Sequence, residues 1–249
     1  MRTFLTLWRR ELAAYFLSPI AYVVMIFFLV VMGFSFWLLV NALVQGEASG
    51  ATIMNDLFAS IFFWLPMLTV VPVLTMRLFA EEKRSGTIEP LMTAPVTDPA
   101  VVLAKYAGAL TFFVILWIPT LFYALVLRGF SPLSAPMDLG PMLGGYAGAF
   151  LVGAMYLSVG LFCSSLTSNQ IVAAITCFAM ICVAFLSGFI TFIARSDSVR
   201  DATAYISSVA HMRDFSRGAV DTRAVVFYVT VALFMLFATV KVVESRKWK

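Results

Sequence analysis

The sequence predicts an all-α polytopic membrane protein with six transmembrane helices, and three observations carry this prediction. First, 62% of the 249 residues are hydrophobic and only 12% are charged, whereas soluble domains have about half and about a quarter. Second, five intervals contain no Asp, Glu, Lys or Arg: 12–46, 57–76, 106–127, 139–194 and 224–240. Third, each interval reaches the range of about 17 to 25 residues that a helix needs to cross a bilayer. Polar residues at 164–170 divide the longest interval into two crossings.

The chain begins with an amphipathic segment. Aromatic residues recur at helical spacing along 2–17 and basic residues fall opposite them, which is typical of a helix that lies in the membrane interface. We expect this interfacial helix at 1–18. Glu11 projects near the apolar stripe and needs a partner, either a nearby arginine or a neighbouring subunit. Ser18 and Pro19 then turn the chain into span one, at 20–45.

Prolines mark the next two spans. Span two, at 57–79, contains Pro66 and Pro72, each of which removes a backbone donor and favours a kink. Span three, at 99–127, follows Asp98, which is the expected N-cap.

Small residues distinguish span four, at 141–165. Gly145, Ala149 and Gly153 repeat at every fourth position, so another helix can approach closely, and we interpret this stripe as packing. Span five at 170–194, span six at 224–241 and a tail at 242–249 complete the chain.

A further amphipathic segment lies between spans five and six, at 195–222, where apolar residues recur at helical spacing beside charged ones. Gly218 is its expected terminator. His211, the only histidine, lies here. A lone interfacial histidine more often makes a structural hydrogen bond, and a ligand or pH switch is the alternative.

The basic residues predict the orientation. With the N-terminus inside and six crossings, eleven of the 17 basic residues are cytoplasmic: Arg2, Arg9, Arg10, Arg77, Lys83, Arg84, Lys105, Lys241, Arg246, Lys247 and Lys249. The positive-inside rule therefore favours cytoplasmic termini and a cytoplasmic loop at 80–98.

Several classes of function are disfavoured because the sequence lacks the residues or motifs that they require. No ionisable residue lies near the middle of a predicted span, which disfavours proton-coupled carriers and intramembrane proteases. The sequence contains no Gly-x-x-x-x-Gly-Lys-Ser/Thr loop, so we expect neither an ATP site nor enzymatic activity in this chain. Cys163, Cys177 and Cys182 lie in apolar spans and suggest no metal or cofactor site. The dispersed basic residues predict no nucleic-acid partner.

The loop at 80–98 is the densest polar segment. Gly86 can end one helix and Thr87 can cap a second, which gives a helical elbow; a solvated loop is the simpler interpretation. The sequence here resembles the permease subunits of type-2 ATP-binding cassette exporters, whose first cytoplasmic loop carries Glu-Glu-Lys/Arg-x-x-Gly-Thr-x-Glu-x-Leu followed by Pro. The matching residues are Glu81, Glu82, Lys83, Gly86, Thr87, Glu89, Leu91 and Pro95.

Within that family the chain looks most like the permeases of gliding motility and of nitrous-oxide-reductase maturation. The residues that carry this likeness are His211, Phe215, Ser216, Arg217, Gly218, Asp221 and Arg223.

The resemblance implies a multi-pass export permease of the bacterial inner membrane, which pairs with a second copy or a related permease. It also implies a cytoplasmic ABC ATPase, which binds ATP and Mg, docked on a coupling helix at 80–96. The implied interface is Glu81, Glu82, Lys83, Arg84, Gly86, Thr87, Glu89, Leu91, Met92 and Pro95. Membrane lipid and a periplasmic or membrane accessory protein are further expected partners.

Two other functions stay open at this point. The chain could be a noncatalytic anchor or mechanical transmission subunit of a larger envelope machine, or a membrane-embedded enzyme built on His211 with Asp214 and Asp221. An apolar pathway is compatible with lipids, lipid-linked polymers, peptides or hydrophobic small molecules.

Overall fold

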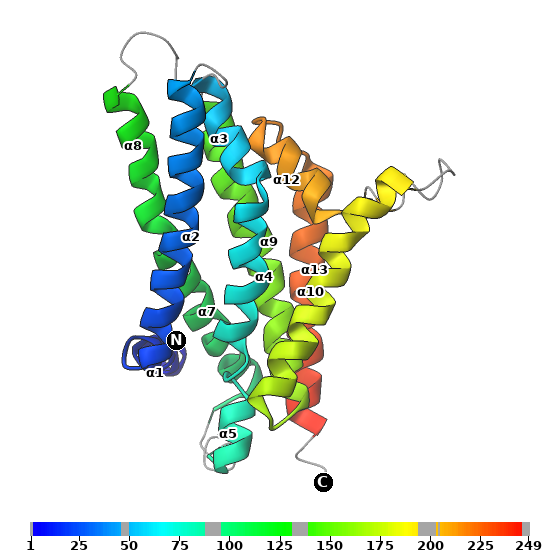
Figure 1. The fold of residues 1–249 in the computed structure, drawn as a ribbon. Coiled ribbons are helices and arrows are strands. Elements are labelled where there is room, and N and C mark those ends of the chain that lie inside the picture. Colours follow the sequence, from blue (N-terminus) through cyan, green and yellow to red (C-terminus); the bar gives the residue numbers. More distant parts are fainter. Residues whose placement is uncertain are drawn as a thin grey trace.

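The computed structural model describes residues 2–45, 50–87, 96–130, 139–193, 203 and 205–245, and every regular element in this part of the chain is a helix. Six helical stretches are long and apolar enough to cross a membrane, which confirms the predicted number of spans. They are Pro19–Val44, Ile61–Ser85, Asp98–Leu127, Leu139–Leu166, Gln170–Phe189 and Thr222–Ser245. Figure 1 shows them as one elongated bundle.

The first helix does not run along the bundle as the six long helices do (Figure 1). α1 (Arg2–Phe16) lies at the foot of α2 (Pro19–Val44), and Leu17 and Ser18 connect the two (Figure 1). Pro19 occupies the start of α2, where its missing N–H leaves no helical hydrogen bond unmade.

The second span consists of more pieces than predicted. α3 (Gly50–Ala59) includes residues 57–59, and α4 (Ile61–Thr75) begins only after the extended residue Ser60, so the helix predicted from residue 57 is interrupted at Ser60. No charged residue lies between 57 and 76, so hydropathy alone gave no sign of this break. Both prolines lie inside α4. After turns at 76–79, α5 (Ala80–Ser85) ends at Gly86, whose φ of 72° suits glycine.

The third span also has an internal break. It comprises α7 (Asp98–Trp117), the 3₁₀ turn η1 (Ile118–Thr120) and α8 (Leu121–Phe130). Thr97, not Asp98, occupies the N-cap position, since Thr97 is extended and Asp98 is already helical. The carboxylate of Asp98 in the first turn still complements the helix dipole.

α9 (Leu139–Leu166) is the central helix and packs against α3, α4, α7, α10, α12 and α13. A Cβ atom at Gly145 would overlap the ring of Phe58, and one at Gly153 would overlap the ring of Phe113. The packing role predicted for this small-residue stripe is therefore confirmed. α3 and α7 approach α9 because glycine leaves room for these rings.

The last helices are α10 (Gln170–Ile193), α12 (Ser208–Ser216) and α13 (Thr222–Ser245). α13 runs beyond the predicted end at 241, and an ion pair between Lys241 and Glu244 at 2.8 Å extends its last turn. In Figure 1, α1, α5 and the end of α13 lie at one end of the bundle, whereas α3 and α12 lie toward the other. We call these the α5 end and the α12 end.

Candidate functional site

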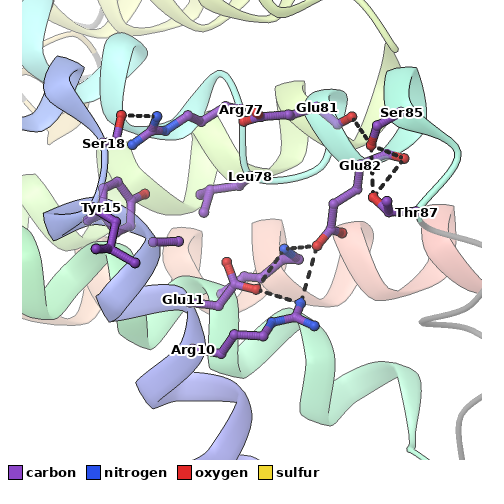
Figure 2. A pocket seen from close by; sticks show the side chains of 13 residues that line it. Arg10, Glu11, Tyr15, Ser18, Arg77, Leu78, Glu81, Glu82, Ser85 and Thr87 are labelled. Atoms are coloured by element: carbon purple, nitrogen blue, oxygen red, sulfur yellow. Dashed lines mark hydrogen bonds and ion pairs between the residues drawn. The ribbon is translucent and has the colours of Figure 1, made fainter.

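Four charged side chains from three helices meet at the α5 end (Figure 2). Lys105 of α7 donates from Nζ to Oε1 of Glu82 in α5 at 2.7 Å and to Oε1 of Glu11 in α1 at 3.0 Å. Arg10 Nη2 lies 3.1 Å from the same oxygen of Glu11 and 3.4 Å from that of Glu82. We call these four residues the ion cluster.

Burial makes the ion cluster a strong constraint. The Lys105 side chain is only 2% exposed, and those of Glu11 and Glu82 are 11% and 17% exposed. A buried charge is tolerated when it is paired, and the loss of one partner leaves the other uncompensated. The ion cluster therefore fixes α1 and α5 to α7. It also shows that Glu11 finds its partners within the chain, including the nearby Arg10, without a neighbouring subunit.

The sequence of α7 explains how α1 comes this close. Lys105, Gly108 and Thr111 recur at three-residue spacing and so share one helix face. A Cβ atom at Gly108 would lie 2.9 Å from that of Glu11, so only glycine leaves room for the α1 backbone. Trp8 Nε1 donates to Thr111 Oγ1 at 3.1 Å. α1 is thus packed along α7 rather than simply lying on lipid.

A second set of hydrogen bonds ties the α4–α5 junction to α9. Ser164 Oγ accepts from the backbone N–H groups of Phe79 and Ala80, both at 3.1 Å, and donates to the Met76 carbonyl at 3.0 Å. One fully buried hydroxyl thereby satisfies three backbone groups at the break in the second span.

The predicted interface residues occupy different positions on this segment. Lys83 Nζ donates to the Ser165 carbonyl at the end of α9. Glu81 and Arg84 are exposed, and Thr87 Oγ1 shares a hydrogen bond of 2.8 Å with Ser85 Oγ. The predicted residues Glu89, Leu91, Met92 and Pro95 lie outside the described part of the chain.

A cavity of about 570 Å³ opens between α1, the α4–α5 junction and α7 (Figure 2). On its wall, Arg77 Nη1 donates to Ser18 Oγ at 2.6 Å, and the guanidinium lies 5.5 Å from the centre of the Tyr15 ring. Tyr15 OH donates to the Leu74 carbonyl at 2.8 Å. Burial raises the pKa of Tyr15 above its ordinary value, so this hydroxyl stays a donor.

Sequence reasoning missed the two residues that organise the site. Lys105 is the only charged residue within predicted span three, and this isolation was the available signal. Ser164 carried no such signal, because it stood in a run of polar residues that indicates a turn.

At the α12 end, His211 Nδ1 lies 3.2 Å from Tyr228 OH of α13, which makes the histidine part of a structural hydrogen bond. Burial lowers the pKa of His211, and nearby Asp214 and Asp221 partly oppose this. Phe215 is buried at Gly148 of α9. These contacts dock α12 on α9 and α13.

The other residues predicted in this segment lie directly after the end of α12. Arg217 is exposed, Gly218 has a φ of 81°, and Asp221 Oδ1 accepts the Arg223 N–H at 2.8 Å. Among the residues that the structure describes, no three His, Cys, Asp or Glu are placed to hold a metal ion.

Residues 40–240 match a protein-family model described as "ABC-2 family transporter protein". The match covers more than half of the chain, with all of spans two to five and most of span six. No curated protein matches the chain.

Proposed function

The chain belongs to the ABC-2 transporter family, and from this premise we propose that it couples ATP hydrolysis by a separate ABC ATPase to work across the membrane. Membership makes it a permease subunit of an ABC transporter with a multi-pass membrane domain. In this family ATP hydrolysis normally belongs to a partner. The chain would therefore contribute the moving helices, and ATP and Mg would bind in the partner.

One observation supports this proposal above others: α5 lies at the end of the bundle and is held from two sides. The ion cluster connects Glu82 of α5 to α1 and α7. Lys83 connects the same short helix to the end of α9. A partner that displaces α5 would act directly on α7 and α9, because Lys105 and Lys83 bind these helices to α5 through partly buried polar contacts. It would act on α1 through Lys105, which also binds Glu11 in a buried contact.

We further propose that the α5 end faces the cytoplasm of a bacterium, in its inner membrane. Both described ends of the chain lie at the α5 end (Figure 1), which agrees with the predicted bias of basic residues. A second copy or a related permease would complete the membrane assembly, and export is the proposed direction. The likeness to the gliding-motility and nitrous-oxide-reductase branch stays a prediction carried by residues 211–223.

The test is a charge reversal on the surface of the proposed coupling segment. Arg84 is exposed, and Glu89 belongs to the same sequence motif. The variant Arg84→Glu with Glu89→Lys should reduce both recovery of the ATPase with the purified chain and stimulation of ATP hydrolysis, because it removes partner contacts and leaves the ion cluster intact. Charge pairs at interfaces contribute a few kcal/mol, so we expect a loss of about tenfold or more.

The matched control reverses an exposed arginine at the α12 end, Arg217→Glu, which should leave both measurements unchanged. Equal ATPase recovery and equal stimulation for the two variants would contradict the proposal. Recovery of the ATPase without any effect on its activity would instead favour the alternative, a noncatalytic membrane anchor.

A further inference from the structure

The cavity at the α5 end lies where the amphipathic α1 meets the first membrane span. Its wall includes Leu17 and Ser18, which connect the amphipathic α1 to the first membrane span. Leu17 is 85% exposed, and Ile20 and Val23 in the first two turns of α2 are 40% and 65% exposed. A molecule in this cavity would therefore have polar surroundings at one side and hydrocarbon next to it.

The charges that line the cavity balance in number. The cations are Arg10, Arg77 and Lys105, and the anions are Glu11, Glu81 and Glu82. Four of these six neutralise one another within the ion cluster. Arg77 and Glu81 remain, and neither forms an ion pair in the part of the chain that the structure describes. The cavity thus offers one cation and one anion to a ligand.

Arg77 is held in place before any ligand arrives. Its Nη1 donates to Ser18 Oγ, and its guanidinium lies over the Tyr15 ring. A guanidinium has five N–H donors, and one is used here, so several stay available. Guanidinium groups match phosphate oxygens in geometry as well as charge. Arg77 is therefore suited to a phosphate group.

Glu81 provides the anionic group of the cavity. Its side chain is exposed and lines the same cavity four positions along the chain. An ionised carboxylate only accepts hydrogen bonds, so it favours a primary ammonium, which has N–H donors, over a quaternary ammonium, which has none. A ligand that carries a phosphate and no cation would pair with Arg77 but leave Glu81 without a counter-ion.

We propose that this cavity binds the headgroup of an aminophospholipid, with the phosphate on Arg77 and the primary ammonium on Glu81. The acyl chains then run along the exposed apolar surface of α2. The bound lipid links the first span to the α4–α5 junction, beside the ion cluster but separate from it.

The experiment measures thermal unfolding of the purified full-length chain in detergent micelles, without an ATPase. Phosphatidylethanolamine, phosphatidylcholine, phosphatidylglycerol or soluble phosphoethanolamine is added. A ligand that binds only the folded state raises the unfolding midpoint. We expect phosphatidylethanolamine to act at about tenfold lower concentration than either other lipid, because each lacks one charge-assisted hydrogen bond. Equal responses to the three lipids, or an equal response to phosphoethanolamine, would overturn the proposal.

Two variants and a control test which residues cause the preference for phosphatidylethanolamine. Glu81→Gln and Arg77→Gln should each abolish the advantage of phosphatidylethanolamine, whereas Arg84→Gln, an exposed arginine on the same segment outside the cavity lining, should retain it. Arg77 also holds Ser18, so Glu81→Gln decides if the Arg77 variant does not fold. Full lipid preference in Glu81→Gln would contradict the assignment, and the proposed coupling to an ATPase would be untouched by that result.

Discussion

Lys105 shows how a charged residue is accommodated inside a membrane span. It lies in the second turn of α7, where its side chain is 2% exposed and is neutralised by two carboxylates from other helices. The sequence indicated that Glu11 needs a partner, because Glu11 interrupts an apolar stripe. It could not identify Lys105, since the two residues are 94 positions apart and no local pattern connects them.

Replacement of Lys105 by Met should lower the free energy of unfolding by about 3 kcal/mol, since it leaves Glu11 and Glu82 buried with only the half-exposed Arg10 as a cation. Chemical unfolding in micelles, followed by circular dichroism, measures this change. The triple variant Lys105→Met, Glu11→Gln, Glu82→Gln removes the unpaired charges and should recover most of the loss. A single variant as stable as the unmodified chain would show that the ion cluster does not hold α1.

His211 should make stability depend on pH. Burial lowers its pKa below the ordinary value of 6.5, so the folded state favours the neutral ring beside Tyr228. Between the folded pKa and about 6.5 the unfolded chain binds more protons, and stability therefore falls as the pH falls through this window. Unfolding midpoints at about pH 7.5 and pH 5.5 measure the loss. The loss should be smaller in His211→Gln, and equal losses in both proteins would exclude this role.

At the scale of helices, the second span differs most from its prediction. Pro66 and Pro72 both lie within α4, α4 begins only after the extended residue Ser60, and a further break at 76–79 contains no proline. Ser164, 84 and 85 positions away, supplies the hydrogen bonds at this break. Helical propensity and hydropathy are local properties, so neither can report a hydroxyl that arrives from another helix.

Replacement of Ser164 by Ala should leave the N–H groups of Phe79 and Ala80 and the Met76 carbonyl without this partner. We expect a loss of about 1 to 3 kcal/mol, together with faster amide hydrogen exchange at 76–80. The neighbouring variant Ser165→Ala is the matched control. Ser165 is equally buried, but its hydroxyl donates to Phe162 within its own helix. The proposal for Ser164 fails if the two variants exchange alike.

For the molecule as a whole, the sequence predicted six spans, and the described residues contain six helices long and apolar enough to cross a membrane. Span number follows from lengths of apolar chain, because each helix satisfies its own backbone hydrogen bonds in lipid. The arrangement of those spans depends on contacts such as Gly145 with Phe58 and Gly153 with Phe113, which join distant segments. A small-residue stripe can identify the helix that is approached, but not the helices that approach it.

Orientation in the membrane is tested by thiol labelling in intact cells. A cysteine at Ser85, on the α5 end, should react with a membrane-impermeant maleimide only after the cells are permeabilised. A cysteine at Arg217, on the α12 end, should react at once; both positions are exposed. The unmodified chain controls for Cys163, Cys177 and Cys182. The opposite labelling pattern would place α5 outside the cell, where no cytoplasmic ATPase can reach it.

The pairing of Glu11 with Lys105 also sets an order for biogenesis. Synthesis proceeds from the N-terminus, so α1 leaves the ribosome long before α7, which carries the cation that Glu11 requires. Until the third span has been inserted, the nascent α1 can lie on the membrane surface but cannot pack against α7. Docking of the first helix is therefore a late assembly step, which a chain arrested before residue 105 would never complete.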